Sequence, residues 1–338
     1  MMGVIVIEGI IITILVFTGT REQIMTILPP NLKHGIAVGI GVFIAFIGFQ
    51  QMGWVAKGPE GVFLTHGVFH SKSVAVASLG LLIMVLLLAR KTTGTILLGI
   101  LATTVIAAVA DALFPDKTPL TSWPKAIFSM PDFSTFGKAD LAAAFKPALA
   151  GTIFAFLISD FFDTMGTVIG VAEQGGLLDK KGNLPGLKRI LLVDSFGAIW
   201  GGLCGASSTT SYIESAAGVS EGGRTGLTAV IVSVLFLIAL FLTPLFGVVP
   251  AVATAPALVV VGFLMMRMIR EIDFSGIEEG IPSFLIVLLV PLTQSISTGI
   301  GAGIVSYVFL QTALGKFRRV AIPLYIIAAL FVVSFLLG

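Results

Sequence analysis

The feature that most constrains this chain is a succession of long apolar runs that fill most of its length. Apolar residues make up 56% of the 338 residues and charged residues only 11%, whereas soluble domains carry about 25% charged residues. Runs of this length and composition are typical of membrane-spanning helices. The sequence therefore predicts an all-α, polytopic membrane protein that lies in the lipid bilayer of the cell membrane (inner or plasma membrane). The net charge of +2 gives no indication of a nucleic-acid partner.

Short polar stretches separate the apolar runs, so each run is expected to cross the membrane. The expected segments are 3–19, 34–52, 74–89, 95–113, 149–171, 190–204, 225–243, 250–268, 281–312 and 321–337. Each half of 281–312 is short for a full span. We interpret this run as two short antiparallel helices hinged near Ser297–Thr298.

The basic residues give this arrangement an orientation. Most of the 20 Lys and Arg residues fall on one face, with Arg21, Lys180 and Lys181 among them. The positive-inside rule makes that face cytoplasmic. A proline-rich linker, 114–148, separates an N-terminal half, 1–113, from a C-terminal half that extends to the end of the chain.

One polar stretch, GASSTTSYIESAAGVSEGGRTGLT at 205–228, interrupts the apolar pattern between two predicted spans. Polar backbone at membrane depth is tolerated where it is buried in protein or lines a water-filled cavity. The Ser-Thr run favours extended chain, and a short helix can follow Glu214. The Glu214 carboxylate could accept two adjacent N–H groups of a flat heterocycle, or it could cap the helix. Thr210 and Ser211 could line a pocket or satisfy the extended chain, and Tyr212 could stack on a ligand or pack internally.

Further acidic residues lie within predicted spans. Asp160 and Asp163 are three residues apart, on one helical face with Thr164 one turn further along. Burial and mutual repulsion favour a proton on one of the two carboxyls, which a proton-coupled transporter requires. For Asp194 a structural hydrogen-bonding role is favoured over contact with a ligand, and together with Thr164 it is assigned to proton coupling or support of the site. For Glu8 a structural role is favoured over a functional one.

No metal or organic cofactor is expected. The sequence contains one cysteine, Cys204, and its three histidines, His34, His66 and His70, lack the spacing of metal ligands. The coupling ion, a proton, is the only small ion that the acidic residues indicate.

Several strings resemble the AzgA-type purine permeases, which belong to the nucleobase–cation symporters together with the uracil and xanthine permeases. They are SDFFDTMGTVIGVAEQGG, DSFGAIWGGLCGASSTTSYIESAAGVSEGGRTGLTA, VPAVATAPALVVVGFLMM and VPLTQSISTGIGAGIVSY. The resemblance runs through essentially the whole chain, and the string STTSYIESAAGV followed by GGRTGLTA is its most specific part.

This resemblance implies two inverted repeats of seven segments, which form a core and a gate domain, with short strand-helix elements meeting at the site. In the C-terminal repeat, 149–338, it assigns 149–243 to the core and 250–338 to the gate. Residues 206–220 are then the second strand-helix element. The first apolar segment resembles the family's fourth span, so the N-terminal repeat is expected to be incomplete, lacking about the first three spans.

The resemblance also implies a function: uptake of adenine, guanine or hypoxanthine together with protons, by a protein that is not an enzyme. It implies that Asp160 and Glu214 contact the base and that Asp163 supports binding or proton coupling. The family's fold suggests a homodimer.

Three alternatives remain open at this point. An anion carrier of the same fold, for sulfate or dicarboxylates, is disfavoured because Asp160 and Glu214 would repel an anion. A non-transporting fragment that needs a partner to supply further spans is a second alternative. A membrane prenyl-transfer enzyme would need a second aspartate-rich cluster for Mg²⁺, which the sequence lacks.

Overall fold

The structure is a computed structural model, and it describes residues 2–58, 64–115, 119–124, 126–146, 149–179, 184–212, 214–220 and 222–337. Lys180 and Lys181, which we expected on the cytoplasmic face, lie outside these residues. So do parts of the proline-rich linker.

Helices form along the apolar runs, as predicted. Within the described residues, six helical stretches have the length and composition to cross a membrane: α3 (Pro30–Gln51), α4 (Lys72–Ala89), α5 (Thr95–Leu113), Ala150–Ala172 of α7 (Ala150–Gln174), Ala251–Glu271, and α14 (Ile296–Ala313). The stretch Ala251–Glu271 consists of α12 (Ala251–Met265) and a 3₁₀ turn, Met266–Glu271. The other apolar helices are α1 (Met2–Phe17), α8 (Leu187–Leu203), α10 (Gly226–Phe241), α13 (Ile277–Thr293) and α15 (Ile322–Leu337).

The smaller elements were not predicted, apart from the short helix after Glu214, which is α9. They are α2 (Thr20–Ile27), α6 (Leu141–Ala144), α9 (Ser215–Ser220), α11 (Thr243–Phe246), a 3₁₀ turn at Phe317–Arg319, and two strands, β1 (Val55–Lys57) and β2 (Leu64–His66), that pair antiparallel. Their brevity explains the omission, because such short elements leave no periodic hydrophobic pattern in a sequence.

The predicted hinge near Ser297–Thr298 was placed too late in the chain. Helix α13 ends at Thr293, and Gln294 follows in the left-handed conformation with a φ of 53°. Ser295 then starts α14, because its side chain accepts a hydrogen bond from the backbone N–H of Thr298. The two helices have 17 and 18 residues, so they are longer than the half-spans that we expected.

The chain divides into two compact units. The first comprises Met1–Ile40, Asp132–Ser220 and Met265–Gly338, and the second comprises Gly41–Pro131 and Glu221–Leu264. Each unit combines segments from both sides of the proline-rich linker, so the units are not the two halves of the sequence. The division into inverted repeats is a statement about internal symmetry, and it stays a prediction.

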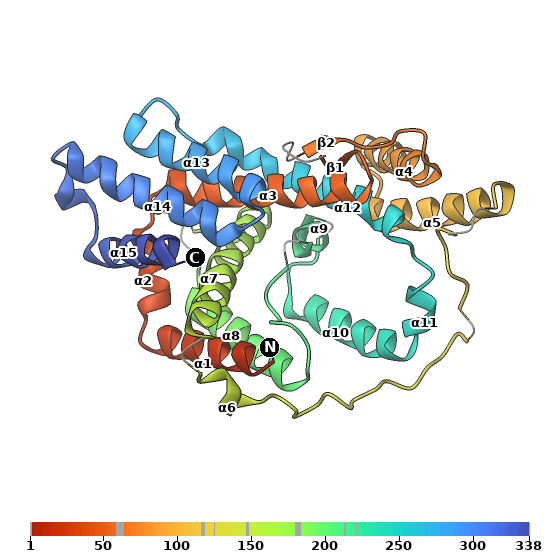
Figure 1. Ribbon diagram of the computed structural model, residues 1–338, viewed down its shortest axis with the longest axis horizontal. Helices are drawn as coiled ribbons and strands as arrows, with labels where there is room; N and C mark the ends of the chain where they lie inside the picture. Colours follow the sequence, from red (N-terminus) through yellow and green to blue (C-terminus); the bar gives the residue numbers. More distant parts are fainter. Residues whose placement is uncertain are drawn as a thin grey trace. The chain divides into compact units, whose positions relative to one another are not determined.

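In the first unit, α7 packs against α1, α9 and α14, and α1 lies along α8 (Figure 1). Small residues allow the close approach of α1 and α8. A Cβ atom at Gly9 would lie 2.9 Å from the backbone nitrogen of Ile199, and one at Gly202 would lie 3.1 Å from that of Val6. This packing fixes α1 beside the polar residues of α8.

In the second unit, α4 packs against α5, and the hairpin of β1 and β2 precedes α4. A Cβ atom at Gly80 of α4 would meet Thr103 of α5 at 2.5 Å, so this glycine lets the two helices approach closely. Lys72 donates to Asp111 at 2.9 Å, and Asp111 also accepts hydrogen bonds from Thr121.

Candidate functional site

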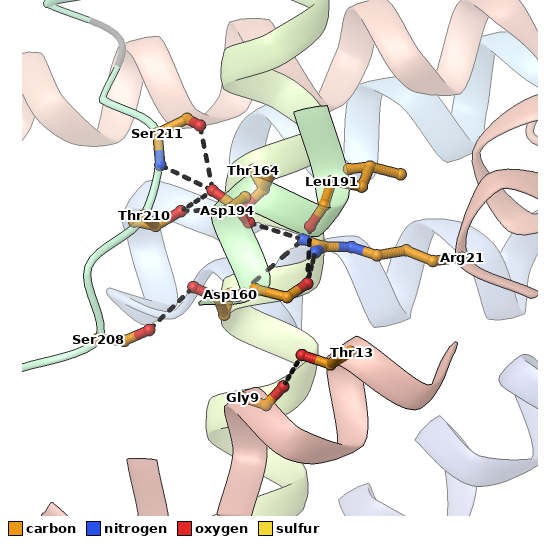
Figure 2. Close-up of polar contacts among 11 residues, drawn as sticks. Gly9, Thr13, Arg21, Asp160, Thr164, Leu191, Asp194, Ser208, Thr210 and Ser211 are labelled. Carbon is orange, nitrogen blue, oxygen red and sulfur yellow. Dashed lines mark hydrogen bonds and ion pairs between the residues drawn. The ribbon is translucent and has the colours of Figure 1, made fainter. Parts of the chain in front are cut away.

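The polar residues of the first unit converge on Asp194, a buried carboxylate of α8. Its Oδ1 atom accepts hydrogen bonds from the Ser211 backbone N–H at 2.9 Å, the Ser211 hydroxyl at 3.1 Å and the Thr210 hydroxyl at 3.3 Å. Its Oδ2 atom accepts from the Thr164 hydroxyl at 2.8 Å and from Arg21 at 3.2 Å. Figure 2 shows Arg21 and the segment that carries Thr210 and Ser211 approaching Asp194 from opposite sides. Asp194 thus links α2, α7, α8 and the extended segment.

Arg21, in the first turn of α2, is completely buried. Its guanidinium also donates to the Ser195 hydroxyl at 3.2 Å and lies 5.4 Å from the ring centroid of Phe161. We had expected Arg21 among the basic residues of the cytoplasmic face; its burial in an ion pair was not predicted, and the side of the membrane on which it lies stays a prediction. The buried acids of the same unit attract the cation inward, and a planar guanidinium is suited to such a buried ion pair.

Asp160 occupies the middle of α7, four residues before Thr164, so the two side chains lie on the same face of the helix. The Oδ1 atom of Asp160 accepts a hydrogen bond from the Ser208 hydroxyl at 3.2 Å. Its Oδ2 atom lies 4.0 Å from Arg21 Nη2 and has no hydrogen-bond donor within the described residues. Asp160 therefore has an unused acceptor atom beside the extended segment.

The extended segment, residues 206–212, follows α8 and leads into α9, as the low helix preference of its Ser and Thr residues predicted. It joins no β-ladder within the described part of the chain. Two glycines of α8 let it lie close to that helix. A Cβ atom at Gly197 would lie 2.9 Å from the carbonyl oxygen of Thr209, and one at Gly201 would lie 2.5 Å from that of Ser207.

The remaining predicted site residues border this network without hydrogen bonds to Asp194. Asp163 is half-buried on α7, and its carboxylate is repelled by those of Asp160, Asp194 and Glu214. Glu214 directly precedes α9 and is exposed. Tyr212 is 60% exposed.

The structure thus brings Thr164, Asp194, Thr210 and Ser211 into one hydrogen-bonded network. Asp160 joins it through Arg21, which forms ion pairs with both Asp160 and Asp194. Thr164 and Thr210 also bond to each other, at 2.8 Å. The hydroxyls of Thr210 and Ser211 are used within this network, and their predicted contact with a substrate stays a prediction.

Sequence reasoning missed the roles of Arg21 and of Ser195, which accepts a hydrogen bond from Arg21. The available signal for Arg21 was an imbalance of charge. Acidic residues that lie in or beside apolar runs include Glu8, Asp160, Asp163, Asp194 and Glu214, and buried acids require a cation or a proton.

Cys204 ends the turn from α8 into the extended segment and is half-buried. Its carbonyl oxygen accepts a hydrogen bond from the Thr135 hydroxyl at 3.3 Å. The backbone at this turn is therefore tied to the chain that precedes α6.

Chemically, the site offers hydrogen-bond acceptors with a surplus of negative charge. The one cation Arg21 is shared between Asp194, at 3.2 Å, and Asp160, at 4.0 Å, whereas no ion pair is found for Asp163 or Glu214 within the described residues. Such a site suits a ligand that presents N–H donors, and it disfavours an anion.

Comparison with known proteins identifies relatives along almost the entire chain. A model of the family described as "Permease family" (Xan_ur_permease) matches residues 1–302. The guanine/hypoxanthine permease PbuO of Bacillus subtilis is 41% identical over 326 residues, which cover 95% of this chain and 74% of that protein. The adenine permease AdeP of Escherichia coli is 36% identical over 333 residues, 98% of this chain and 73% of AdeP. A putative permease of Methanocaldococcus jannaschii is 38% identical, covering 99% of this chain and 75% of its own length.

Among solved structures, the transmembrane domain of the cyanobacterial bicarbonate transporter BicA resembles this chain with a TM-score of 0.60. The match covers 88% of this chain and 75% of that domain, at 14% identity. At this identity the likeness concerns the fold, and it confirms the prediction of an all-α, polytopic transporter fold.

Proposed function

The chain belongs to the permease family, and from that membership we propose that it is a purine nucleobase permease that imports its substrate together with protons. It is a multi-pass protein of the cell membrane and a transporter. The named relatives transport guanine and hypoxanthine or adenine, as their names state. These bases share a flat bicyclic ring with N–H donors on its edge.

One observation supports this proposal above all: a buried carboxylate with an unused acceptor, Asp160, lies beside the extended segment that leads to a second carboxylate, Glu214. Ring N–H groups of a purine are donors, and a carboxylate accepts them without needing a donor of its own. We assign Asp160 and Glu214 to the base edge, and Tyr212 to the ring face. The hydroxyls of Thr210 and Ser211 bind the extended segment to Asp194. In this proposal, that attachment positions Glu214 and Tyr212 relative to Asp160.

Proton coupling forms part of the proposal because the site carries more acidic groups than cations. A neutral purine brings no charge to offset them, whereas a proton does. Asp163, beside Asp160 on the same helical face, supports binding or coupling in this scheme. The proposal includes no cofactor beyond the coupling proton, and it includes a homodimer, which mass photometry of the purified protein tests.

An anion carrier of the same fold is the rival within transport. The BicA fold likeness alone does not favour it, because that likeness carries no information about the ligand. The carboxylates of Asp160 and Glu214 oppose anion binding, because the neighbouring cation, Arg21, is shared between Asp160 and Asp194. Uptake that is inhibited by sulfate or succinate, and not by purines, would establish the rival.

The test is uptake of labelled hypoxanthine, guanine and adenine in cells that lack their own purine permeases. Glu214→Gln keeps the shape of the side chain and replaces an acceptor oxygen by a donor, so we expect loss of purine binding with normal membrane insertion. Glu271→Gln, the same change at an exposed site on the 3₁₀ turn after α12, is the matched control. Undiminished binding by Glu214→Gln would remove Glu214 from the proposed site.

A further inference from the structure

Glu8, in the middle of α1, is the most isolated acidic group of the first unit. Its exposed fraction is 0%, and neither of its carboxylate oxygens has a hydrogen-bond partner within the described residues. Glu8 lies on a helix, α1, that packs against both α7 and α8. The sequence favoured a structural role for Glu8 over a functional one, but packing alone does not explain a carboxyl group at this position.

The charges that act on Glu8 come from three other elements. They are Asp160 on α7, Asp194 on α8 and Arg21 on α2. Arg21 is always protonated and forms its closest ion pair with Asp194, at 3.2 Å, whereas Asp160 Oδ2 is 4.0 Å away. One arginine cannot neutralise three acids, so at least one of these carboxyls needs another positive charge.

We propose that Glu8 is the group that binds and releases the coupling proton. The inference rests on the proposed function, and it moves the proton from the substrate-contacting helix α7 to the neighbouring helix α1. A carboxyl that is buried without a hydrogen-bond donor is stable in its neutral form and costly in its ionised form. Asp194, by contrast, has donors on both oxygens, and Asp160 has one from Ser208.

The chemistry of the site favours a proton over a metal cation. A metal ion such as Ca²⁺ needs about six to eight oxygen ligands. Within the described residues, no group of three or more His, Cys, Asp and Glu side chains is arranged to hold one. A proton needs a single oxygen, which Glu8 provides.

Coupling between the proton and the purine follows from their shared neighbours. A purine that donates to Asp160 requires this carboxyl in its ionised form, and an ionised Asp160 repels a second negative charge at Glu8, so the bound purine favours a proton on Glu8. By linkage, a proton on Glu8 then strengthens purine binding by the same factor as the purine strengthens proton binding. In transport, the O–H bond of Glu8 forms with a proton from outside and breaks when the proton leaves to the inside.

The test compares exchange with gradient-driven uptake in proteoliposomes that contain the full chain. Exchange of labelled for unlabelled hypoxanthine requires no net proton movement, whereas accumulation does. With one proton per purine, a gradient of one pH unit sustains about ten-fold accumulation. We expect Glu8→Gln to retain exchange and to lose this accumulation, and we expect Glu271→Gln to behave as wild type.

Glu8→Asp, which keeps the carboxyl group, is expected to restore accumulation at least in part. It also serves as the second variant if Glu8→Gln does not reach the membrane. Wild-type protein should take up protons from weakly buffered solution when purine is added at a pH where Glu8 is partly ionised, and Glu8→Gln should take up fewer.

Three results would overturn the inference. In the first, Glu8→Gln accumulates purine normally. In the second, it loses exchange and accumulation together, which would indicate a structural role. In the third, Asp163→Asn retains exchange and loses accumulation while Glu8→Gln keeps both, which would place the proton on Asp163. Failure of the wild-type protein to exchange any purine would instead reject the proposed function itself.

Discussion

At the scale of the residue, the site depends on one buried ion pair. Arg21 and Asp194 are separated by 173 positions in the sequence and joined at 3.2 Å in the structure. No local pattern in the sequence links them, and Arg21 follows an apolar run, where cations usually mark the membrane boundary. The acidic residues of the site could be predicted because each one interrupts an apolar run. The role of Arg21 as their cation could not be predicted, because only the fold brings Arg21 close to them.

Removal of Arg21 should therefore destabilise the protein strongly. Arg21→Met leaves Asp194 buried without its cation, and losing one partner of a buried pair costs about 3–5 kcal/mol. We expect a large fall in the melting temperature of the detergent-solubilised protein, measured by tryptophan fluorescence. Arg189→Met, an exposed arginine on α8, should change it little.

The double variant Arg21→Met/Asp194→Asn tests whether the ion pair itself accounts for the effect of Arg21→Met. Because it removes both charges, it should be more stable than Arg21→Met alone. Equal stability of the two variants would show that the ion pair is not the interaction that Arg21 provides.

At the scale of the element, the helices could be predicted and the connections could not. Apolar runs bounded by Gly, Pro and charged residues place α4, α5, α7 and α10 within a few residues of their observed ends. The turn between α13 and α14 was misplaced because Ser295 and Ser297 are both suitable helix caps. In the structure, the left-handed conformation of Gln294 ends α13, so Ser295 rather than Ser297 becomes the cap of α14.

The position of the extended segment depends on two glycines of α8, Gly197 and Gly201, because a side chain at either would collide with its backbone. In Gly201→Ala, the new Cβ would lie 2.5 Å from Ser207 O and from Thr209 Oγ1, so the segment must shift. Hydrogen bonds from Ser208 to Asp160 and from Ser211 to Asp194 would be strained. Bonds to charged groups contribute about 1.5–3 kcal/mol each, so we expect purine affinity to fall at least about ten-fold.

Gly151→Ala on α7 is the matched control, because its Cβ would meet no atom within 4 Å. Alanine favours a helix over glycine, so this variant should bind purine normally and be slightly more stable. Radioligand binding to purified protein measures both variants. Wild-type affinity in Gly201→Ala would show that the position of the segment does not govern binding.

At the scale of the whole molecule, the membrane replaces water as the solvent of most outward-facing side chains. Helix α10 shows this clearly, since none of its residues is buried although it is almost entirely apolar. Family membership and the run of apolar helices could be predicted from the sequence. The two compact units could not, because each combines distant segments whose association leaves no local signal.

A charge on α10 should therefore impair membrane insertion. Leu235 is 58% exposed, and Leu235→Lys places an ammonium group near the centre of the helix. A central lysine costs about 2.5–3.5 kcal/mol on insertion scales. We expect less full-length protein in the membrane fraction by quantitative immunoblot, whereas Thr93→Lys in the exposed loop before α5 should insert normally.

The position of Cys204 has a practical consequence for spectroscopy. It is the only thiol of the sequence, and it lies where α8 gives way to the extended segment. A spin label or fluorophore attached there would be specific without the removal of any other cysteine. These 338 residues thus carry a single attachment point from which rearrangement of this segment on purine addition can be followed in real time.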